Sequence, residues 1–399
     1  MIKRRIRRFY KGEIKDILAM YFSKENKEER HVKLFEKKFA QYVGVKFAVA
    51  TCSGRNGFGL ILDSLGLNSG DEIIMPAYTL KNLIYLIADK GLKAKLIDID
   101  GDSFNINPDL IEGRITEKTK VIVATHIFGL PCNMGKISNI ARKYNLKVIE
   151  DCAHACGAEY GGKKVGSLGE AGFFSFESTK LINTFDGGMV TTDNEELACK
   201  IRQKLNKYRT DKNKVMVKAL FTYLEHLFTK SPAYPILLFF LRFKPVEWVA
   251  KKIYFSLRLK SKIGYLRFTE LQALLGLRQL EYLEQRNTKR QHIADEITRR
   301  LKADVYPQRD RSIGKRVYYY YILRLPVKYA DKARIKMLRY GIDIGIEDEI
   351  TNNCSGTLID DYPCPVTEQV FKCALQIPMY DDLSSKEITI IAHAVNSLT

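Results

Sequence analysis

The sequence predicts an α/β protein with a large domain built on a mostly parallel central sheet, and a small C-terminal α+β domain. Between residues 46 and 192, short apolar runs alternate with segments of helical periodicity, which is typical of parallel βαβ units. From about residue 304 onward, shorter strand and helix patterns follow each other. A chain of 399 residues is also long enough for about two domains.

Apolar runs place the strands of the large domain at 46–51, 72–75, 95–100, 121–125, 147–149 and 188–192. Helices are expected at 58–65, 79–90 and 136–144. Before the first strand, the spacing of Leu34, Phe35, Phe39 and Tyr42 puts these side chains on one helix face. Parallel sheets bind their ligands at the carboxyl ends of the strands, so residues that follow these strands are the first candidates for a site.

In the small domain, strands are expected at 318–325 and 342–346, and helices at 328–340 and 385–398. The whole chain then divides into a basic N-terminal arm, a large domain, a basic and apolar insert, and a connecting helix with the small domain. The corresponding ranges are 1–30, 31–199, 200–262 and 263–399.

Two side chains suggest a covalently held cofactor. Lys180 follows an aromatic-rich run, and a lysine in partly apolar surroundings loses some of its preference for the charged form, so its amine can act as a nucleophile. Asp151 comes at the end of the strand that starts at Lys147. A lysine that carries pyridoxal phosphate (PLP) as a Schiff base, and an aspartate that keeps the pyridine nitrogen protonated, are what a PLP enzyme requires.

A phosphate site is expected at the turn after the first strand. Ser53, Gly54 and Arg55 lie between that strand and the next helix. A serine and glycine turn that opens a helix presents free backbone N–H groups and the positive end of the helix dipole. An arginine in this turn can also contact a phosphate.

Three stretches together resemble one known family. They are Glu-Asp-Cys-Ala-His-Ala-Cys-Gly-Ala at 150–158, Gly-x-Lys-x-Val-Gly-Ser-x-Gly at 161–169, and Phe-Ser-Phe-x-x-x-Lys at 174–180 followed by Asp-Gly-Gly at 186–188. This pattern closely resembles the DegT/StrS-type sugar aminotransferases, which have the fold-type I architecture of PLP enzymes. The resemblance covers most of the chain.

The resemblance implies roles for individual residues. Lys180 and Asp151 would be catalytic, and Ser175 would join Ser53, Gly54 and Arg55 around the PLP phosphate. His154 stands where many family members have a glutamine next to the cofactor, and an imidazole there can hydrogen-bond the PLP 3-hydroxyl or stack on the ring.

Other family positions differ in this chain. The aromatic ring that usually stacks on the pyridine aligns with Leu80, so Tyr78 supplies the ring instead or the stacking is absent. Tyr265 stands where an asparagine commonly reaches the neighbouring subunit's phosphate. The usual substrate segment is not recognisable around Glu347–Asn353, which leaves the class of sugar open.

The charge is unusual for an enzyme of this kind. The chain has a formal net charge of +19, and residues 200–262 carry 16 lysines and arginines against three acidic residues. Within them, Val217, Leu220, Phe221, Leu224 and Phe228 fall on one helix face. A basic, amphipathic segment suits an anionic membrane surface, although burial of this face against a partner subunit is an alternative. Nucleic-acid binding lacks a recognisable reading motif.

Eight cysteines show no paired framework, so reduced thiols and a cytoplasmic location are expected. Cys152, His154 and Cys156 offer no evident fourth metal ligand, and we expect them to pack in the core, with no metal site. The basic N-terminus lacks the apolar region of a secretory signal.

The resulting interpretation is a PLP-dependent aminotransferase that converts a keto sugar, expected to be nucleotide-linked, to an amino sugar for surface polysaccharide or glycoconjugate synthesis. Glutamate is the expected amino donor and a homodimer the expected assembly. Related enzymes that dehydrate sugars have a histidine in place of the lysine, so Lys180 argues against that reaction. Two alternatives stay open: a lipid-linked substrate at the membrane surface, and a non-catalytic binding or regulatory protein with the PLP fold.

Overall fold

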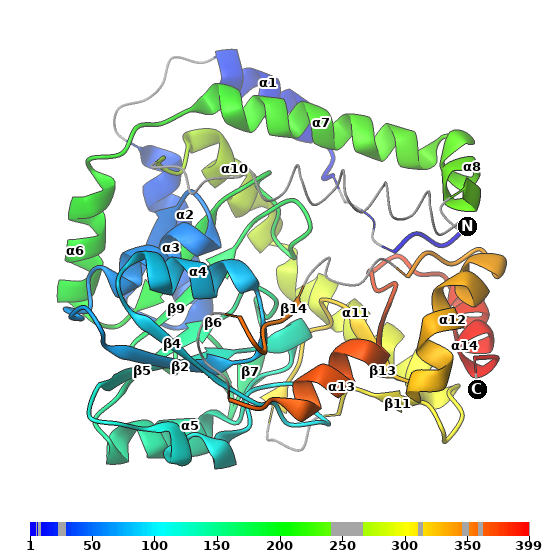
Figure 1. Cartoon of the computed structure of the whole chain (residues 1–399). Helices are drawn as coiled ribbons and strands as arrows, with labels where there is room; N and C mark the ends of the chain where they lie inside the picture. Colours follow the sequence, from blue (N-terminus) through cyan, green and yellow to red (C-terminus); the bar gives the residue numbers. More distant parts are fainter. Residues whose placement is uncertain are drawn as a thin grey trace.

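The large domain is built around a seven-stranded sheet (Figure 1). The computed structural model describes residues 1–4, 6, 9–22, 29–240, 266–309, 314–344, 351–357 and 362–398. In the sheet the strands lie in the order β1, β10, β9, β6, β5, β2, β4. Their bounds are β1 Phe47–Thr51, β2 Glu72–Pro76, β4 Lys93–Ile97, β5 Thr119–Thr125, β6 Lys147–Asp151, β9 Ala171–Ser175 and β10 Gly188–Thr192.

Six of these strands run in one direction. β10 is antiparallel to both of its neighbours, β1 and β9, and the remaining pairs are parallel. The mostly parallel sheet is therefore confirmed, and the carboxyl ends of six strands share one edge. The expected strand at 95–100 lies earlier, at Lys93–Ile97, and β9 was missed.

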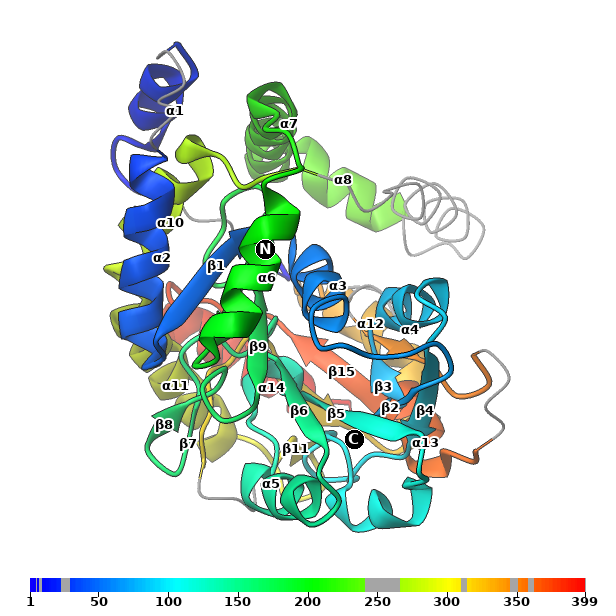
Figure 2. The same ribbon diagram turned by 90° about the vertical axis from the view of Figure 1, so that its left-hand side faces the viewer.

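Helices cover both faces of the sheet, as Figure 2 shows. One face packs against α3 (Gly54–Leu62), α4 (Lys81–Asp89) and α6 (Glu195–Leu205). The other face packs against α2 (Arg30–Val43), α5 (Met134–Lys143) and α10 (Glu270–Leu280). Residues 200–205, at the start of the expected insert, belong to α6.

Helix α2 buries Phe35 and Phe39 completely, but Leu34 is 43% exposed, so its predicted place on the same helix face as Phe35 and Phe39 was wrong. Leu34 precedes Phe35 by one residue, about 100° around the helix, which turns it away from the core. Helix α10 approaches α2 closely at Gly276, where an added Cβ would lie 2.5 Å from Cζ of Phe35.

The C-terminal domain combines a three-stranded antiparallel sheet with four helices. The strands are β11 Tyr306–Pro307, β13 Tyr321–Arg324 and β15 Ala374–Ile377. The helices are α11 Leu283–Arg299, α12 Val327–Arg339, α13 Pro365–Cys373 and α14 Ser385–Asn396. The small α+β domain is therefore present, with β13 shorter than expected.

The strand expected at 342–346 is not formed in its described residues, 342–344. Ile342 makes only an isolated bridge to Ile2, whose N–H donates to Gly341 and whose carbonyl accepts from Asp343. The carbonyl of Gly341 and the N–H of Asp343 thus bond to Ile2 instead of to a strand of the sheet. Residues 345 and 346 lie outside the described part.

Three further helices lie to one side of the large domain: α1 Glu13–Phe22, α7 Lys212–Lys230 and α8 Ala233–Phe240. α1 and α7 run next to each other along the top of Figure 1. No described helix has both the length and the apolar composition needed to cross a membrane. Short pieces complete the description: β3 Tyr78–Thr79, β7 Glu159–Tyr160, β8 Lys163–Lys164, β12 Gly314–Lys315, β14 Asn352–Asn353, η1 Pro108–Leu110, η2 Glu112–Arg114 and η3 Ile127–Gly129.

The α2–α10 contact gives a test of the fold. Gly276→Ala should lower the free energy of unfolding by about 1–3 kcal/mol, because the new methyl group meets the fully buried Phe35. Urea unfolding measures the change. Gly113→Ala is the control, because nothing lies within 4 Å of its added Cβ. A Gly276→Ala protein as stable as the control would contradict the close packing.

Candidate active site

The carboxyl edge of the sheet brings Asp151 and Lys180 together. Asp151 ends β6, is buried, and accepts a hydrogen bond from the backbone N–H of Ala153 at 3.0 Å. Burial raises the pKa of Asp151 above its ordinary value of 3.8, while the Ala153 hydrogen bond and the charge of Lys180 act in the opposite direction. A carboxyl group buried beside a cation suits a ligand that offers it a positively charged N–H.

Thr125 adds a second polar group next to Asp151. The two residues are register partners on the parallel strands β5 and β6, so their side chains lie on the same face of the sheet. The hydroxyl of Thr125 is buried and has no hydrogen-bond partner among the described residues. A buried polar atom of this kind ordinarily has a partner, and a polar ligand beside Asp151 can supply it.

The expected phosphate turn is formed at the N-terminus of α3. The hydroxyl of Ser53 caps the helix by accepting from the N–H of Asn56 at 3.1 Å. Ser175, at the end of β9, lies so close that a Cβ on Gly54 would be 3.1 Å from the Cβ of Ser175. Gly187 forms a bridge with Ser53 from the other side. Ser53, Gly54 and Ser175 therefore meet at the N-terminus of α3, the positive end of its helix dipole, and the half-buried Arg55 follows.

A row of aromatic rings forms one wall of this edge. The rings of Tyr78 and Phe128 are 6.0 Å apart, those of Phe128 and His154 are 5.8 Å apart, and those of His154 and Tyr319 are 4.5 Å apart. The last two pairs are stacked. Tyr78 is buried at one end of the row, whereas Leu80 precedes α4 and packs with the core on the other side. His154 is thus held between two rings rather than standing alone.

His154 is held in its neutral form. Burial lowers its pKa well below the ordinary 6.5, and the charge of Lys180 adds to this effect. The Nδ1 atom accepts from the backbone N–H of Phe128 at 3.4 Å. In the neutral ring, this hydrogen bond assigns the remaining proton to Nε2, which can then donate to a ligand.

Tyr319 is the residue that sequence reasoning missed. It comes from the C-terminal domain, yet the Nζ of Lys180 lies 4.6 Å from the centre of its ring. The hydroxyls of Tyr319 and Thr179 are 2.9 Å apart, and Thr179 donates to the carboxylate of Glu177 at 2.7 Å. Tyr319 therefore donates to Thr179, and this chain of hydrogen bonds orders the loop that carries Lys180. The four consecutive tyrosines at 318–321 were the available signal in the sequence.

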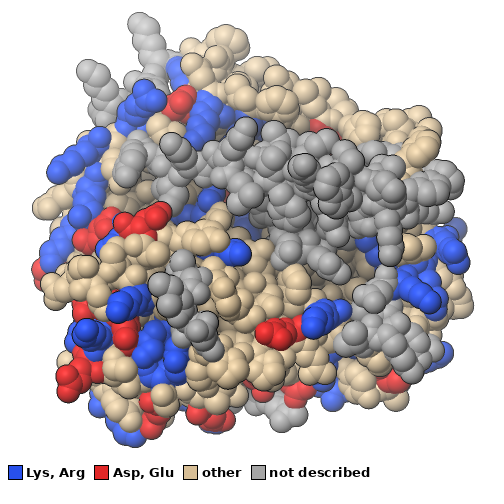
Figure 3. All heavy atoms as spheres, in the orientation of Figure 1, with Lys and Arg blue, Asp and Glu red and all other residues tan. Residues whose placement is uncertain are grey.

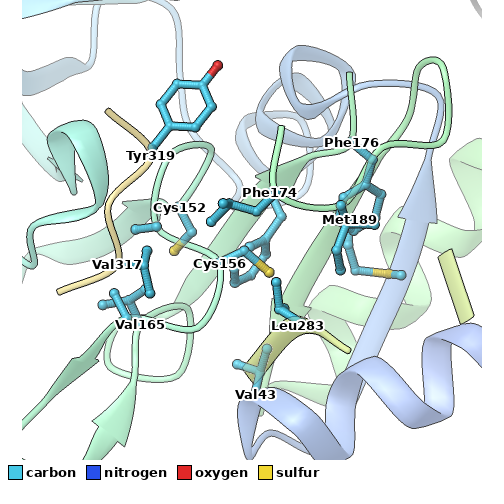
Figure 4. Close-up of a cluster of buried hydrophobic side chains, with 14 of the residues drawn as sticks. Val43, Cys152, Cys156, Val165, Phe174, Phe176, Met189, Leu283, Val317 and Tyr319 are labelled. Atoms are coloured by element: carbon cyan, nitrogen blue, oxygen red, sulfur yellow. The ribbon is translucent and has the colours of Figure 1, made fainter. Parts of the chain in front are cut away.

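The cysteines near this edge pack in the core. Figure 4 shows Cys152 and Cys156 among buried apolar side chains, with the hydroxyl of Tyr319 turned away from that cluster. All eight cysteines are free thiols. These positions bear out the expected packing of Cys152 and Cys156.

A separate buried group, His126, Glu150 and Cys152, has metal-ligating atoms within 4.8 Å of one another. Hydrogen bonds already occupy its histidine and carboxylate. Nδ1 of His126 accepts from the N–H of Cys132 at 3.0 Å, and its Nε2 lies 3.1 Å from Glu150. The group is therefore a structural hydrogen-bond network.

The remaining expected residues lie partly outside the described chain. Tyr265 and residues 345–350 are not described. Asn352 is, and its side-chain oxygen accepts from the N–H of Lys81 at 3.0 Å. This contact holds the end of the Glu347–Asn353 segment against β3, beside Tyr78.

The neutral state of His154 predicts a pH dependence of stability. Because its folded pKa is depressed, the unfolded chain binds more protons below about pH 6.5, and stability falls as the pH drops from there. His154→Gln should flatten this fall by up to about 1.4 kcal/mol per pH unit in urea unfolding of the apoprotein. The exposed His292→Gln is the control. Equal slopes for wild type and His154→Gln would contradict the assignment.

Solved structures of aminotransferases share the fold of this chain. An aminotransferase from Psychrobacter cryohalolentis is 25% identical, with a TM-score of 0.78 over 98% of this chain and 97% of that chain. PseC of Helicobacter pylori, an aminotransferase at 22% identity, shares the fold with a TM-score of 0.79, over 98% and 97% of the two chains. The fold-type I architecture is confirmed.

Curated relatives match in two ways. The GDP-perosamine synthase of Caulobacter vibrioides is 43% identical over 43% of this chain, and the dTDP-3-amino-3,6-dideoxy-alpha-D-galactopyranose transaminase of Aneurinibacillus thermoaerophilus is 44% identical over 41%. These matches span only 47% and 46% of the relatives' own lengths. The spore coat polysaccharide biosynthesis protein SpsC of Bacillus subtilis is 28% identical over 92% of this chain and 89% of that protein.

A sequence model of the DegT/DnrJ/EryC1/StrS aminotransferase family matches residues 10–396. This match covers nearly the whole chain, including the candidate site on both of its domains. The resemblance drawn from the motifs at 150–188 is confirmed. The chain belongs to the DegT/DnrJ/EryC1/StrS aminotransferase family.

Proposed function

We propose that the protein is a PLP-dependent aminotransferase that converts a nucleotide-linked keto sugar to an amino sugar, with glutamate as the amino donor. The observation that carries this proposal is the buried Asp151 close to Lys180 at the carboxyl edge of the sheet, beside the open N-terminus of α3. Relatives named for amino-sugar and polysaccharide synthesis support the substrate class.

The residues at this edge fit PLP, the cofactor expected of the family. Asp151 is the partner for the pyridine nitrogen, because its buried carboxyl group gains most from a cationic N–H. Gly54 lets the turn approach β9 closely, which places Ser53 and Ser175 where both would contact a phosphate, with Arg55 as an additional cation. His154 offers a neutral Nε2–H, and the aromatic row from Tyr78 to Tyr319 lines the wall. When bound, PLP supplies an electron sink for the bonds at the amino-bearing carbon.

The protein's own groups then have distinct tasks. Lys180 provides the amine that attaches the cofactor and afterwards moves a proton as base and acid. Hydrogen bonds from Tyr319 through Thr179 to Glu177 position its loop. Asp151 keeps a proton on the ring nitrogen, and the α3 N-terminus holds the phosphate in place.

Assembly and location are further parts of the proposal. We infer a cytoplasmic homodimer, as the family resemblance implies, that associates with the inner face of the membrane without crossing it. The surplus of lysine and arginine in residues 200–262 supports an anionic surface as the partner, and we infer no nucleic-acid role.

The activity is tested by mass spectrometry of products from PLP, glutamate and a panel of keto sugars, free, nucleotide-linked and lipid-linked. The expected product is the amino sugar of a nucleotide-linked substrate. Borohydride should fix the cofactor on the peptide that contains Lys180, and Lys180→Ala should lose both label and product. A Lys180→Ala protein that still labels and turns over would refute the assignment.

Asp151→Asn tests the role of the carboxyl group. The amide keeps the size of the side chain and can accept from Ala153, but it cannot hold the ring nitrogen protonated. We expect kcat to fall by roughly 100-fold or more, with little change in thermal stability. The exposed Asp109→Asn, which loses only a surface contact to Lys136, is the control. Activity within a few-fold of wild type would reduce Asp151 to a structural residue.

A further inference from the structure

Helix α7 turns an apolar stripe to solvent. Six of its side chains, between 44% and 67% exposed, recur at helical spacing: Val217, Leu220, Phe221, Leu224, Leu227 and Phe228. The sequence predicted five of these on one face, and the structure confirms that grouping. The opposite side of the helix is buried, with Val215 and Ala219 in a core cluster that also holds Leu271 and Leu275 of α10.

Helix α1 presents a second stripe of the same kind. Ile14, Leu18 and Phe22 follow each other at four-residue spacing and are between 48% and 79% exposed. Ile17, about 100° around α1 from Leu18, is buried in the same core cluster as Val215 of α7. Both helices therefore pack inward on one cluster and turn their apolar stripes away from it.

Side-chain contacts hold α1 and α7 antiparallel. At one end, the hydroxyl of Tyr223 donates to the carboxylate of Glu13 at 3.0 Å. At the other end, the hydroxyl of Tyr21 donates to Asn213 at 3.1 Å. Figure 1 shows both helices along one side of the molecule. We call the nine exposed side chains of these two stripes the α1–α7 face.

The charges around the α1–α7 face are mostly positive. Lys11, Lys15, Lys214 and Lys230 are exposed on or next to the two helices, whereas Glu225 is the one exposed acid within α1 and α7. Lys3 lies near Lys230, and its pKa is lowered by burial and by that neighbouring charge. Over α7 the molecular surface is largely free of charge, with basic residues gathered towards its left end in Figure 3.

The exposed apolar side chains and the surrounding lysines together indicate which kind of partner binds the α1–α7 face. Nine exposed apolar side chains grouped on two helices exceed the scattered single residues of an ordinary protein surface and mark an interaction site. A second copy of the same face would bring lysines against lysines, which opposes self-association. An anionic lipid surface meets the lysines with opposite charge and accepts the apolar side chains below its headgroups.

We propose that the α1–α7 face docks on anionic phospholipid, with α1 and α7 lying in the plane of the headgroups. This proposal rests on the membrane location proposed above and names its contact surface, which includes a helix outside residues 200–262. Phe22, Phe221 and Phe228 enter the acyl boundary, while the bordering lysines stay among the headgroup phosphates. The docking needs no turnover, so it can be tested separately from transamination.

The test is flotation of the purified full-length protein with phosphatidylcholine vesicles, with and without phosphatidylglycerol. The protein should float with the anionic vesicles at low salt and much less at high salt, because salt screens the lysines. Leu18→Ser with Phe22→Ser in α1, and separately Phe221→Ser with Leu224→Ser in α7, should each weaken binding by about tenfold or more.

The matched control is Tyr85→Ser with Ile335→Ser, which removes two exposed apolar side chains from α4 and α12. It should float like wild type. Melting curves should be unchanged in all three variants, since every substituted side chain is exposed. Transaminase activity on a soluble substrate should also be unchanged, so that failure of the enzyme assignment and failure of docking are separate results.

Three outcomes would overturn the proposal. One is that wild type ignores anionic vesicles at low salt. Another is that the α1 or α7 variants float as well as the control. The third is that light scattering finds these variants converted from dimer to monomer while wild type does not float, which would assign the α1–α7 face to a second copy of the chain.

Discussion

Two consecutive carboxyl groups at the end of β6 have opposite tasks, and the site depends on both. Glu150 is fully buried and accepts from the backbone N–H groups of Gly166, Leu168 and Gly169 at 2.7–2.9 Å, with His126 3.1 Å away. Such a fully satisfied carboxylate fixes the end of the strand. Because neighbouring residues of a strand face opposite sides, Asp151 is left facing the ligand edge.

The C-terminal domain completes the site through a tight backbone crossing. The N–H of Val317 donates to Gly129 at 2.9 Å, and that of Tyr319 donates to Phe128 at 3.3 Å. Gly129 has a φ of +90°, and a Cβ there would collide with the carbonyl of Val317. Only glycine permits this approach, which sets Tyr319 against His154 and over Lys180. The C-terminal domain therefore contacts Lys180 itself, through Tyr319.

Local patterns in the sequence were enough to predict the sheet, the phosphate turn and the Asp151–Lys180 pair, because each follows from a strand end or a motif of a few residues. The apolar stripe of α7 followed from periodicity in the same way. Local patterns could not identify Tyr319 as a site residue, because its position depends on a contact between segments almost 200 residues apart. The strand expected at 342–346 failed for a similar reason, since pairing with Ile2 is invisible to a local pattern.

Helix α7 carries the exposed apolar stripe and also contacts the segment that precedes the phosphate turn's partner, Gly187. Lys218 forms an ion pair with Asp186, whose backbone carbonyl also accepts from Gln272 at 2.9 Å. Asp186 precedes Gly187, which bridges to Ser53 at the phosphate turn. The ion pair between Lys218 and Asp186 thus connects the helix that carries the exposed apolar stripe to the turn expected to bind the cofactor phosphate. Docking of the α1–α7 face, as proposed above, would therefore act on a helix that is connected to the phosphate turn through Lys218 and Asp186.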